Sequence, residues 1–172
     1  SLSRDHHLTI SQSGLVTIAG GKWTTYRKMG EDTVTQAARL AGLPSRSCKT
    51  ENLPLHGWMN GLDPRDHLSV YGSDIEEIRE MIRRDPELGQ PLHYKLPYLR
   101  AEVVWAVRRE WAMTLSDVLR HRTRAIVLDA AVSMEIAPDV AAIMAAELGL
   151  DAGWAEGQVR GYRELARACL AE

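Results

Sequence analysis

The sequence predicts a mainly α-helical protein in which a compact all-α domain follows a β-hairpin and a single helix. Three observations predict this class. Apolar and polar residues alternate near the N-terminus, apolar residues recur at helical spacing from about residue 63 onward, and the stretch between them carries prolines and glycines without a period. With 172 residues, the chain is long enough for one ordinary domain and part of a second.

The N-terminal residues are expected to form a β-hairpin. Leu8 and Ile10 share one face of the first strand, residues 11–14 (SQSG) are turn formers, and residues 15–19 (LVTIA) are rich in β-branched side chains. A two-stranded hairpin is marginal alone in water. We therefore expect residues 1–44 to be the end of another domain.

A helix should follow the hairpin. Thr24 or Thr25 can cap its start, and it should run to about Ala41, where Gly42 ends it. Residues 45–62 are then expected to be a linker, because they are rich in prolines, glycines and polar residues and show no sustained hydrophobic period.

Residues 63–172 are expected to form the all-α domain. Its helices should be joined by short loops, as in compact helical bundles. The start signals are Asp63-Pro64, a capping box over residues 73–76, the periodic run 98–112, Thr114 or Ser116, Pro138 and Asp151, and Gly149 is a stop signal. Helical spacing places Trp105 and Trp111 in the core, and it allows same-face contacts among Asp117, Arg120 and Arg124.

Composition excludes several function classes. The net charge of −2 argues against a general nucleic-acid binder, which usually carries a basic excess. The six histidines have no H-x-x-x-H spacing and no cysteine partner, so no metal site is expected. The two cysteines suit a reduced cytosolic protein, and no apolar run is long enough for a transmembrane helix.

The junction at residues 18–28 (IAGGKWTTYRK) is the strongest candidate site. Glycines allow close approach of a ligand to the backbone, and the start of a helix offers unpaired N–H groups to negative charge. Lys22 and Thr24 add donors at the same place. The competing interpretation is plain turn chemistry, because the spacings of the Walker and Rossmann motifs are both absent.

Three blocks carry a family resemblance: residues 3–6 (SRDH), 14–34 (GLVTIAGGKWTTYRKMGEDTV) and 101–124 (AEVVWAVRREWAMTLSDVLRHRTR). Together they resemble the C-terminal part of the FAD-dependent glycerol-3-phosphate dehydrogenases. The resemblance spans nearly the whole chain, and the GGK-x-TTYRK block is its most specific element. Trp23 stands where leucine is more usual in the family.

The resemblance implies an enzyme that oxidises sn-glycerol 3-phosphate to dihydroxyacetone phosphate and passes electrons through FAD to a quinone. It implies that Arg4 binds the substrate phosphate and that Gly20, Gly21, Lys22 and Thr24 lie against the flavin. It assigns this chain no catalytic residue. The location it implies is cytoplasmic, with peripheral attachment to the inner face of the membrane as an open option.

The N-terminal GxGxxG unit that such an enzyme needs for FAD is absent from this sequence. We therefore expect a fragment that lacks its FAD domain and is inactive in isolation. The alternative hypothesis is a non-catalytic helical module that docks on the flavin domain, on a second copy or on a membrane-side partner.

Overall fold

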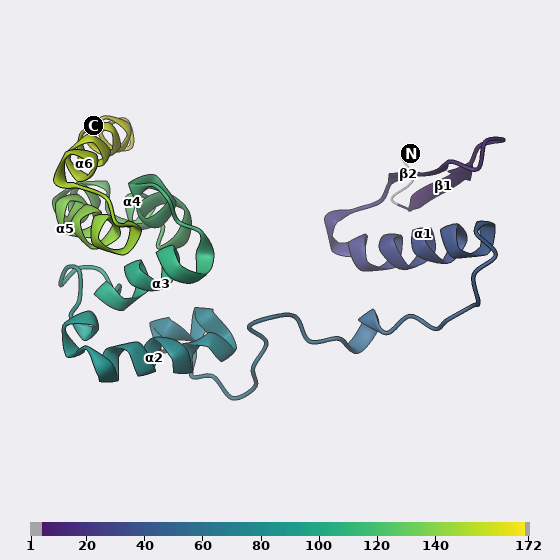
Figure 1. Ribbon diagram of the computed structural model, residues 1–172, viewed down its shortest axis with the longest axis horizontal. Coiled ribbons are helices and arrows are strands. Elements are labelled where there is room, and N and C mark those ends of the chain that lie inside the picture. Colours follow the sequence, from purple (N-terminus) through teal and green to yellow (C-terminus); the bar gives the residue numbers. More distant parts are fainter. Residues whose placement is uncertain (1–4, 171–172) are drawn as a thin grey trace. The chain divides into compact units, whose positions relative to one another are not determined.

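The computed structural model describes residues 5–170, and its contacts divide the chain into two compact units, Ser1–Leu55 and His56–Glu172 (Figure 1). The division falls inside the segment expected to be a linker. We call these parts unit 1 and unit 2 and describe each by itself. The mainly α-helical class predicted from the sequence is confirmed.

Unit 1 holds the predicted hairpin and helix. The antiparallel strands pair in a register that sets Leu8 opposite Ile18, and the helix that follows packs on β2. None of the described residues in unit 1 is fully buried. Its elements are β1 (His6–Ile10), β2 (Val16–Gly20), the 3-10 turn η1 (Trp23–Thr25), α1 (Tyr26–Leu40) and the 3-10 turn η2 (Thr50–Asn52).

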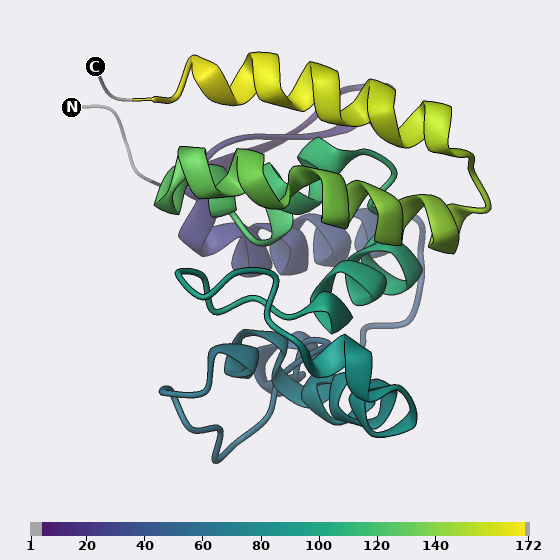
Figure 2. The ribbon, with the colours of Figure 1, turned by 90° about the vertical axis from the view of Figure 1, so that its left-hand side faces the viewer.

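Unit 2 contains the apolar core. Its last two long helices lie side by side and α3 packs against α5 (Figure 2). The elements are η3 (His67–Asp74), α2 (Ile75–Arg84), η4 (Pro86–Gly89), α3 (Arg100–Glu110), the π-helix η5 (Asp117–Arg122), α4 (Ala125–Leu128), α5 (Ala130–Leu148) and α6 (Ala152–Arg167).

Two groups of buried apolar side chains form this core. The larger group is contributed by α3, η5, α4, α5 and α6, and it includes Leu115, Leu119 and Met144. The smaller group joins η3 and α2 to α3 through Ile75, Ile78 and Trp105, among others. Among the described helices, none combines the length and the apolar character that crossing a bilayer requires.

Pro138 does not start a helix, contrary to the expectation from the sequence. It lies inside α5, which begins at Ala130 because the side chain of Asp129 caps it by accepting a hydrogen bond from the Val132 N–H. A proline inside a helix lacks one backbone donor. Ala137 and Val140, close to Pro138 in the sequence, are buried in the core of unit 2.

Three other expectations in unit 2 were wrong. Trp111 is 84% exposed, because α3 ends at Glu110 and Trp111 turns left-handed with φ of +57°. The capping box at residues 73–76 does not form, since Gly72 breaks the backbone there with φ of +56°. In the described part of the chain, Asp117 accepts from the N–H groups of Met113 and Thr114 and forms no ion network with nearby arginines.

Candidate functional site

The predicted flavin-facing residues lie together where β2 leads into α1. Gly20 and Gly21 both have positive φ, +80° and +81°, a backbone conformation that favours glycine. A Cβ on Gly20 would lie 3.1 Å from the carbonyl oxygen of Asp5, and one on Gly21 would lie 2.6 Å from the Met29 sulfur. The positive φ at both positions, with the close backbone approach at Gly20, favours glycine here without a ligand.

The 3-10 turn η1 presents donors to the surface. The hydroxyl of Thr25 accepts from the Lys22 N–H at 3.1 Å and lies 3.0 Å from the Lys22 carbonyl oxygen, which closes the turn. The first N–H groups of a helical turn have no acceptor within it. Lys22 and Thr24 are exposed beside these groups, and within residues 5–170 the Lys22 ammonium makes no ion pair.

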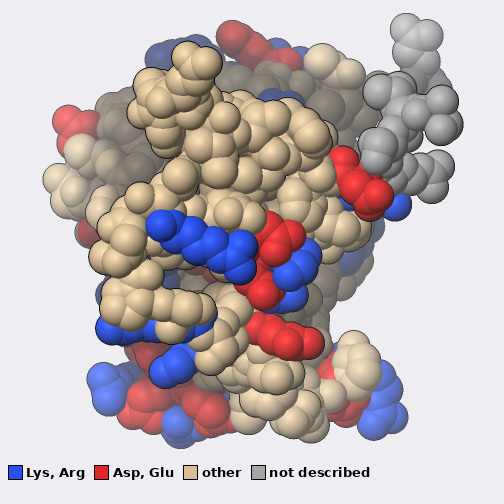
Figure 3. Space-filling view, turned by 90° about the vertical axis from the view of Figure 1, so that its right-hand side faces the viewer, with Lys and Arg blue, Asp and Glu red and all other residues tan. Residues whose placement is uncertain are grey.

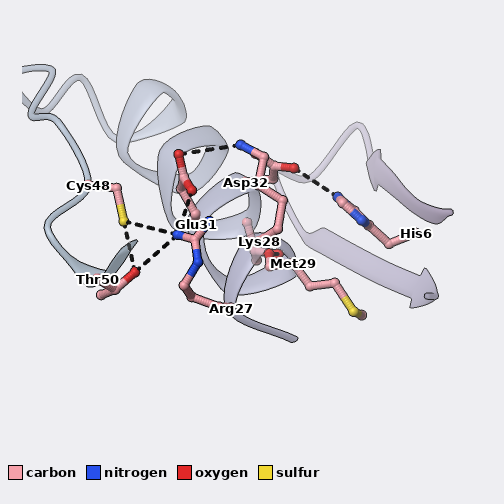
Figure 4. A network of polar contacts seen from close by, with 9 residues as sticks. His6, Arg27, Lys28, Met29, Glu31, Asp32, Cys48 and Thr50 are labelled. Atoms are coloured by element: carbon pink, nitrogen blue, oxygen red, sulfur yellow. Dashed lines mark hydrogen bonds and ion pairs between the residues drawn. The ribbon is translucent and has the colours of Figure 1, made fainter. Parts of the chain in front are cut away.

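A chain of polar contacts fixes α1 against the hairpin (Figure 4). Nε2 of His6, on β1, lies 2.9 Å from the Asp32 carboxylate, which also pairs with Lys28 at 2.9 Å. Lys28 contacts Glu31 as well, at 3.3 Å. The hydrogen bond from Lys28 holds the pKa of Asp32 below its usual range. These contacts hold the start of α1, and hence the junction, in a fixed position relative to β1.

The same chain of contacts continues to the segment after α1. Arg27 donates to Glu31 at 2.9 Å and to the Thr50 hydroxyl at 3.4 Å, and Thr50 lies 3.0 Å from the Cys48 sulfur. The Thr50 hydrogen bonds lower the pKa of Cys48, and the Glu31 hydrogen bond raises that of Arg27. Cys48 and Cys169 are both free thiols at the surface.

Unit 2 contains a separate polar cluster that the sequence analysis missed. Glu102 is 2% exposed and accepts hydrogen bonds from the Leu99 N–H, from His67 and from the Tyr71 hydroxyl. Burial, and then the charge of Glu102, raises the pKa of Tyr71. The three donors all bond to the Glu102 carboxylate. The cluster therefore has a structural role and holds η3 against α3.

Most of unit 2, together with the last residues of unit 1, matches a known family. Residues 48–154 match the C-terminal domain of alpha-glycerophosphate oxidase, which is well over half of the chain. The chain belongs to this family. No solved structure matches it.

Relatives of this alpha-glycerophosphate oxidase family member extend the match to unit 1. A probable mitochondrial glycerol-3-phosphate dehydrogenase of Caenorhabditis elegans is 39% identical over 99% of the chain and 26% of its own length. The mitochondrial glycerol-3-phosphate dehydrogenase of Mesocricetus auratus is 36% identical over 98% of the chain and 25% of its own length. The human enzyme of that name is 36% identical over 88% of the chain and 23% of its own length.

These matches confirm the predicted family resemblance. The chain spans about a quarter of the length of the relatives it matches. The structure brings Gly20, Gly21, Lys22 and Thr24 together at one junction, while Arg4 lies outside the described residues. Contact of these five residues with flavin or substrate stays a prediction.

Two features of this family member could have been found from helical spacing alone. Arg27 and Glu31 are four residues apart, as are Lys28 and Asp32, and such pairs face each other on a helix. The contacts between elements, His6 with Asp32 and Arg27 with Thr50, carry no signal in the local sequence.

Proposed function

We propose that the chain is the C-terminal part of an FAD-dependent glycerol-3-phosphate dehydrogenase. The enzyme oxidises sn-glycerol 3-phosphate to dihydroxyacetone phosphate and passes the electrons to a quinone. The observation that carries the proposal is the match of nearly the whole chain, junction included, to relatives that bear the name glycerol-3-phosphate dehydrogenase. Because the chain spans a quarter of their length, it supplies one side of the site.

The residues at the junction fit the proposed cofactor. The exposed side chains of Lys22 and Thr24 offer an ammonium and a hydroxyl as donors in the same place. When bound, FAD would supply the hydride acceptor that oxidation of the substrate at C2 needs. Donors held in place beforehand stabilise negative charge that develops next to them, and here they would face the N1–C2=O edge of the ring. Arg4 would grip the substrate phosphate through two oxygens.

In this proposal the two units have different tasks. Residues 1–44 end the FAD and substrate domain, residues 45–62 are the linker, and residues 63–172 form a cap domain. The cap carries its own core, and its buried carboxylate is fully occupied by structural partners. A docking role suits such a domain, on the flavin domain, in a dimer or on a membrane-side partner. The whole enzyme would be cytoplasmic and attached peripherally to the inner face of the membrane.

The purified full-length enzyme that carries this chain tests the proposed function. We expect it to contain FAD, and we expect the flavin absorbance to bleach when glycerol 3-phosphate is added without oxygen. The chain alone should bind FAD weakly and oxidise no substrate, because the pyrophosphate needs the GxGxxG unit. A full-length protein without flavin, or flavin that glycerol phosphate leaves oxidised, would contradict the proposal.

The proposed task of Arg4 predicts a defect in substrate binding. In the full-length enzyme, Arg4→Ala should raise KM for glycerol 3-phosphate by roughly ten- to hundred-fold, because a charge-assisted contact is worth ~1.5–3 kcal/mol. The FAD content should stay unchanged. Steady-state kinetics measure the effect, and Arg65→Ala, an exposed arginine of unit 2, is the matched control. An unchanged KM would exclude the phosphate role.

A further inference from the structure

The junction between β2 and α1 is anchored at both of its ends. On the strand side, Gly20 pairs with His6 in the β-ladder. On the helix side, the N–H and the carbonyl oxygen of Lys22 both bond to Thr25, the residue before α1. Between these anchors lies Gly21, with φ of +81°, and glycine has the least restricted backbone of all residues. Contacts outside the junction must therefore fix the angle between the hairpin and α1.

His6 and Asp32 form such a contact. The His6 side chain lies beside the junction, because a Cβ on Gly21 would come within 3.4 Å of the His6 Cβ. Nε2 of His6 lies 2.9 Å from Oδ2 of Asp32 on α1 (Figure 4), and the two side chains are 20% and 35% exposed. A carboxylate accepts and does not donate, so the imidazole N–H is the donor. The contact closes a ring from β1 through the junction and α1 back to β1.

The Asp32 carboxylate is held by a second partner. Lys28, four residues earlier on α1, pairs with its Oδ1 at 2.9 Å, so each carboxylate oxygen has a partner. Figure 3 presents the side of the molecule on which unit 1 lies, where basic and acidic side chains lie next to one another in a short band. Pairs at this helical spacing restrict both side chains. Asp32 therefore meets His6 in a defined orientation.

We propose that Asp32, acting through His6, is a positioning residue for Lys22. This inference rests on the proposed function, in which the Lys22 ammonium stabilises negative charge that develops on the flavin. A donor of this kind is effective because it is held in place before the reaction, and a small displacement weakens it. The ring closed by His6 and Asp32 holds the backbone of Lys22 at one position relative to the hairpin. Asp32 itself contacts neither flavin nor substrate in this proposal.

Variants of the full-length enzyme test the positioning role. Asp32→Ala should slow flavin reduction by glycerol 3-phosphate about tenfold at saturating substrate, a part of the effect of removing the donor itself. His6→Phe, which keeps a ring but removes its N–H, should match Asp32→Ala. Asp32→Asn keeps an acceptor for His6, so its rate should stay close to that of the parent enzyme. Asp32→Ala combined with Lys22→Ala should be no slower than Lys22→Ala alone, since Asp32 acts through Lys22.

The reduction potential of the bound flavin separates positioning from a direct effect of charge. Removing a negative charge near the flavin would raise the potential, whereas a displaced Lys22 lowers it, so we expect Asp32→Ala to lower it. Glu31→Ala is the matched control, because it removes the same charge from the next position of α1. The described ion pairs of Glu31 are with Arg27 and Lys28 of its own helix, so this control should leave rate and potential unchanged.

Hydrogen exchange of the full-length enzyme gives a readout that does not depend on catalysis. The peptide covering residues 18–28 should take up deuterium faster in Asp32→Ala than in the parent or in Asp32→Asn, with and without FAD. The inference alone is overturned if Asp32→Ala keeps the parent rate, if Asp32→Asn is as slow as Asp32→Ala, or if the effects of Asp32→Ala and Lys22→Ala multiply. A Lys22→Ala enzyme with the parent rate and potential overturns the flavin-facing role and this inference with it.

Discussion

Replacing Glu102 with alanine should lower the free energy of unfolding of the chain by about 3 kcal/mol. Leaving a buried donor without its acceptor costs about 1–3 kcal/mol, and three donors converge on this carboxylate. The Leu99 N–H lies 2.6 Å from it, and His67 Nε2 and the Tyr71 hydroxyl each lie 3.0 Å away. The side chain of His67 is 29% exposed, so water can replace part of its lost hydrogen bond. The expected loss of stability is therefore smaller than the sum of three full costs of unpaired buried donors.

Urea unfolding followed by circular dichroism and tryptophan fluorescence measures this loss. Trp105 reports on the region because its ring lies 6.4 Å from that of Tyr71, measured between centroids. Glu102→Gln keeps an acceptor for one or two of the donors, so it should lower the free energy of unfolding by less than Glu102→Ala does. Glu164→Ala, at an exposed position of α6, should change stability by no more than about 0.5 kcal/mol. A Glu102→Ala chain as stable as this control would refute the structural role of the cluster.

Elements with a strong local signal were predicted well. Asp151 caps α6 by accepting from the Trp154 N–H, and Gly149 ends α5 with φ of +68°, as the stop and start signals predict. Both signals depend on backbone chemistry within a few residues, so the sequence carries them in full. The hairpin is a similar case, because turn residues separate two short β-prone runs.

Elements decided by packing were predicted poorly. Trp111 continues the apolar spacing of α3, yet it lies in solvent because the helix ends one residue earlier. There, the guanidinium of Arg122 donates to the Glu110 carbonyl oxygen, a contact that spans twelve residues. Glu102 illustrates the same limit. A carboxylate in a periodic apolar run gives no sign that distant His and Tyr side chains will surround it.

The candidate site also has a part that the sequence predicts and a part that only the structure shows. The glycine pair, Lys22 and Thr24 could be singled out from residue type and spacing alone. The structure adds that the glycines fit closely against Asp5 and Met29, so the turn-chemistry interpretation accounts for them without a ligand. The Lys22 ammonium, which forms no ion pair with a described residue, has no such internal explanation. Lys22 is therefore the residue on which the flavin-facing hypothesis depends most.

Lys22→Ala in the full-length enzyme should slow flavin reduction by glycerol 3-phosphate by about a hundred-fold at saturating substrate. Removing one preorganised donor from developing negative charge costs roughly 10²–10³ in rate. FAD should remain bound, since the pyrophosphate is held elsewhere in the proposed enzyme. Stopped-flow absorbance measures the rate, and the reduction potential of the bound flavin should fall because its reduced, negatively charged form loses a donor.

Two further variants separate this electrostatic role from a packing role. Lys22→Arg keeps the positive charge, so its rate of flavin reduction should be higher than that of Lys22→Ala. If Lys22 acted only through packing, keeping the charge would not raise the rate. Lys49→Ala removes another exposed lysine of unit 1 that forms no described ion pair, and it should leave the rate unchanged. Within residues 5–55, the Lys22 ammonium makes no ion pair, so its loss should not alter the folding of unit 1. A Lys22→Ala enzyme with unchanged rate and potential would leave turn closure, through its backbone bonds to Thr25, as the whole role of this residue.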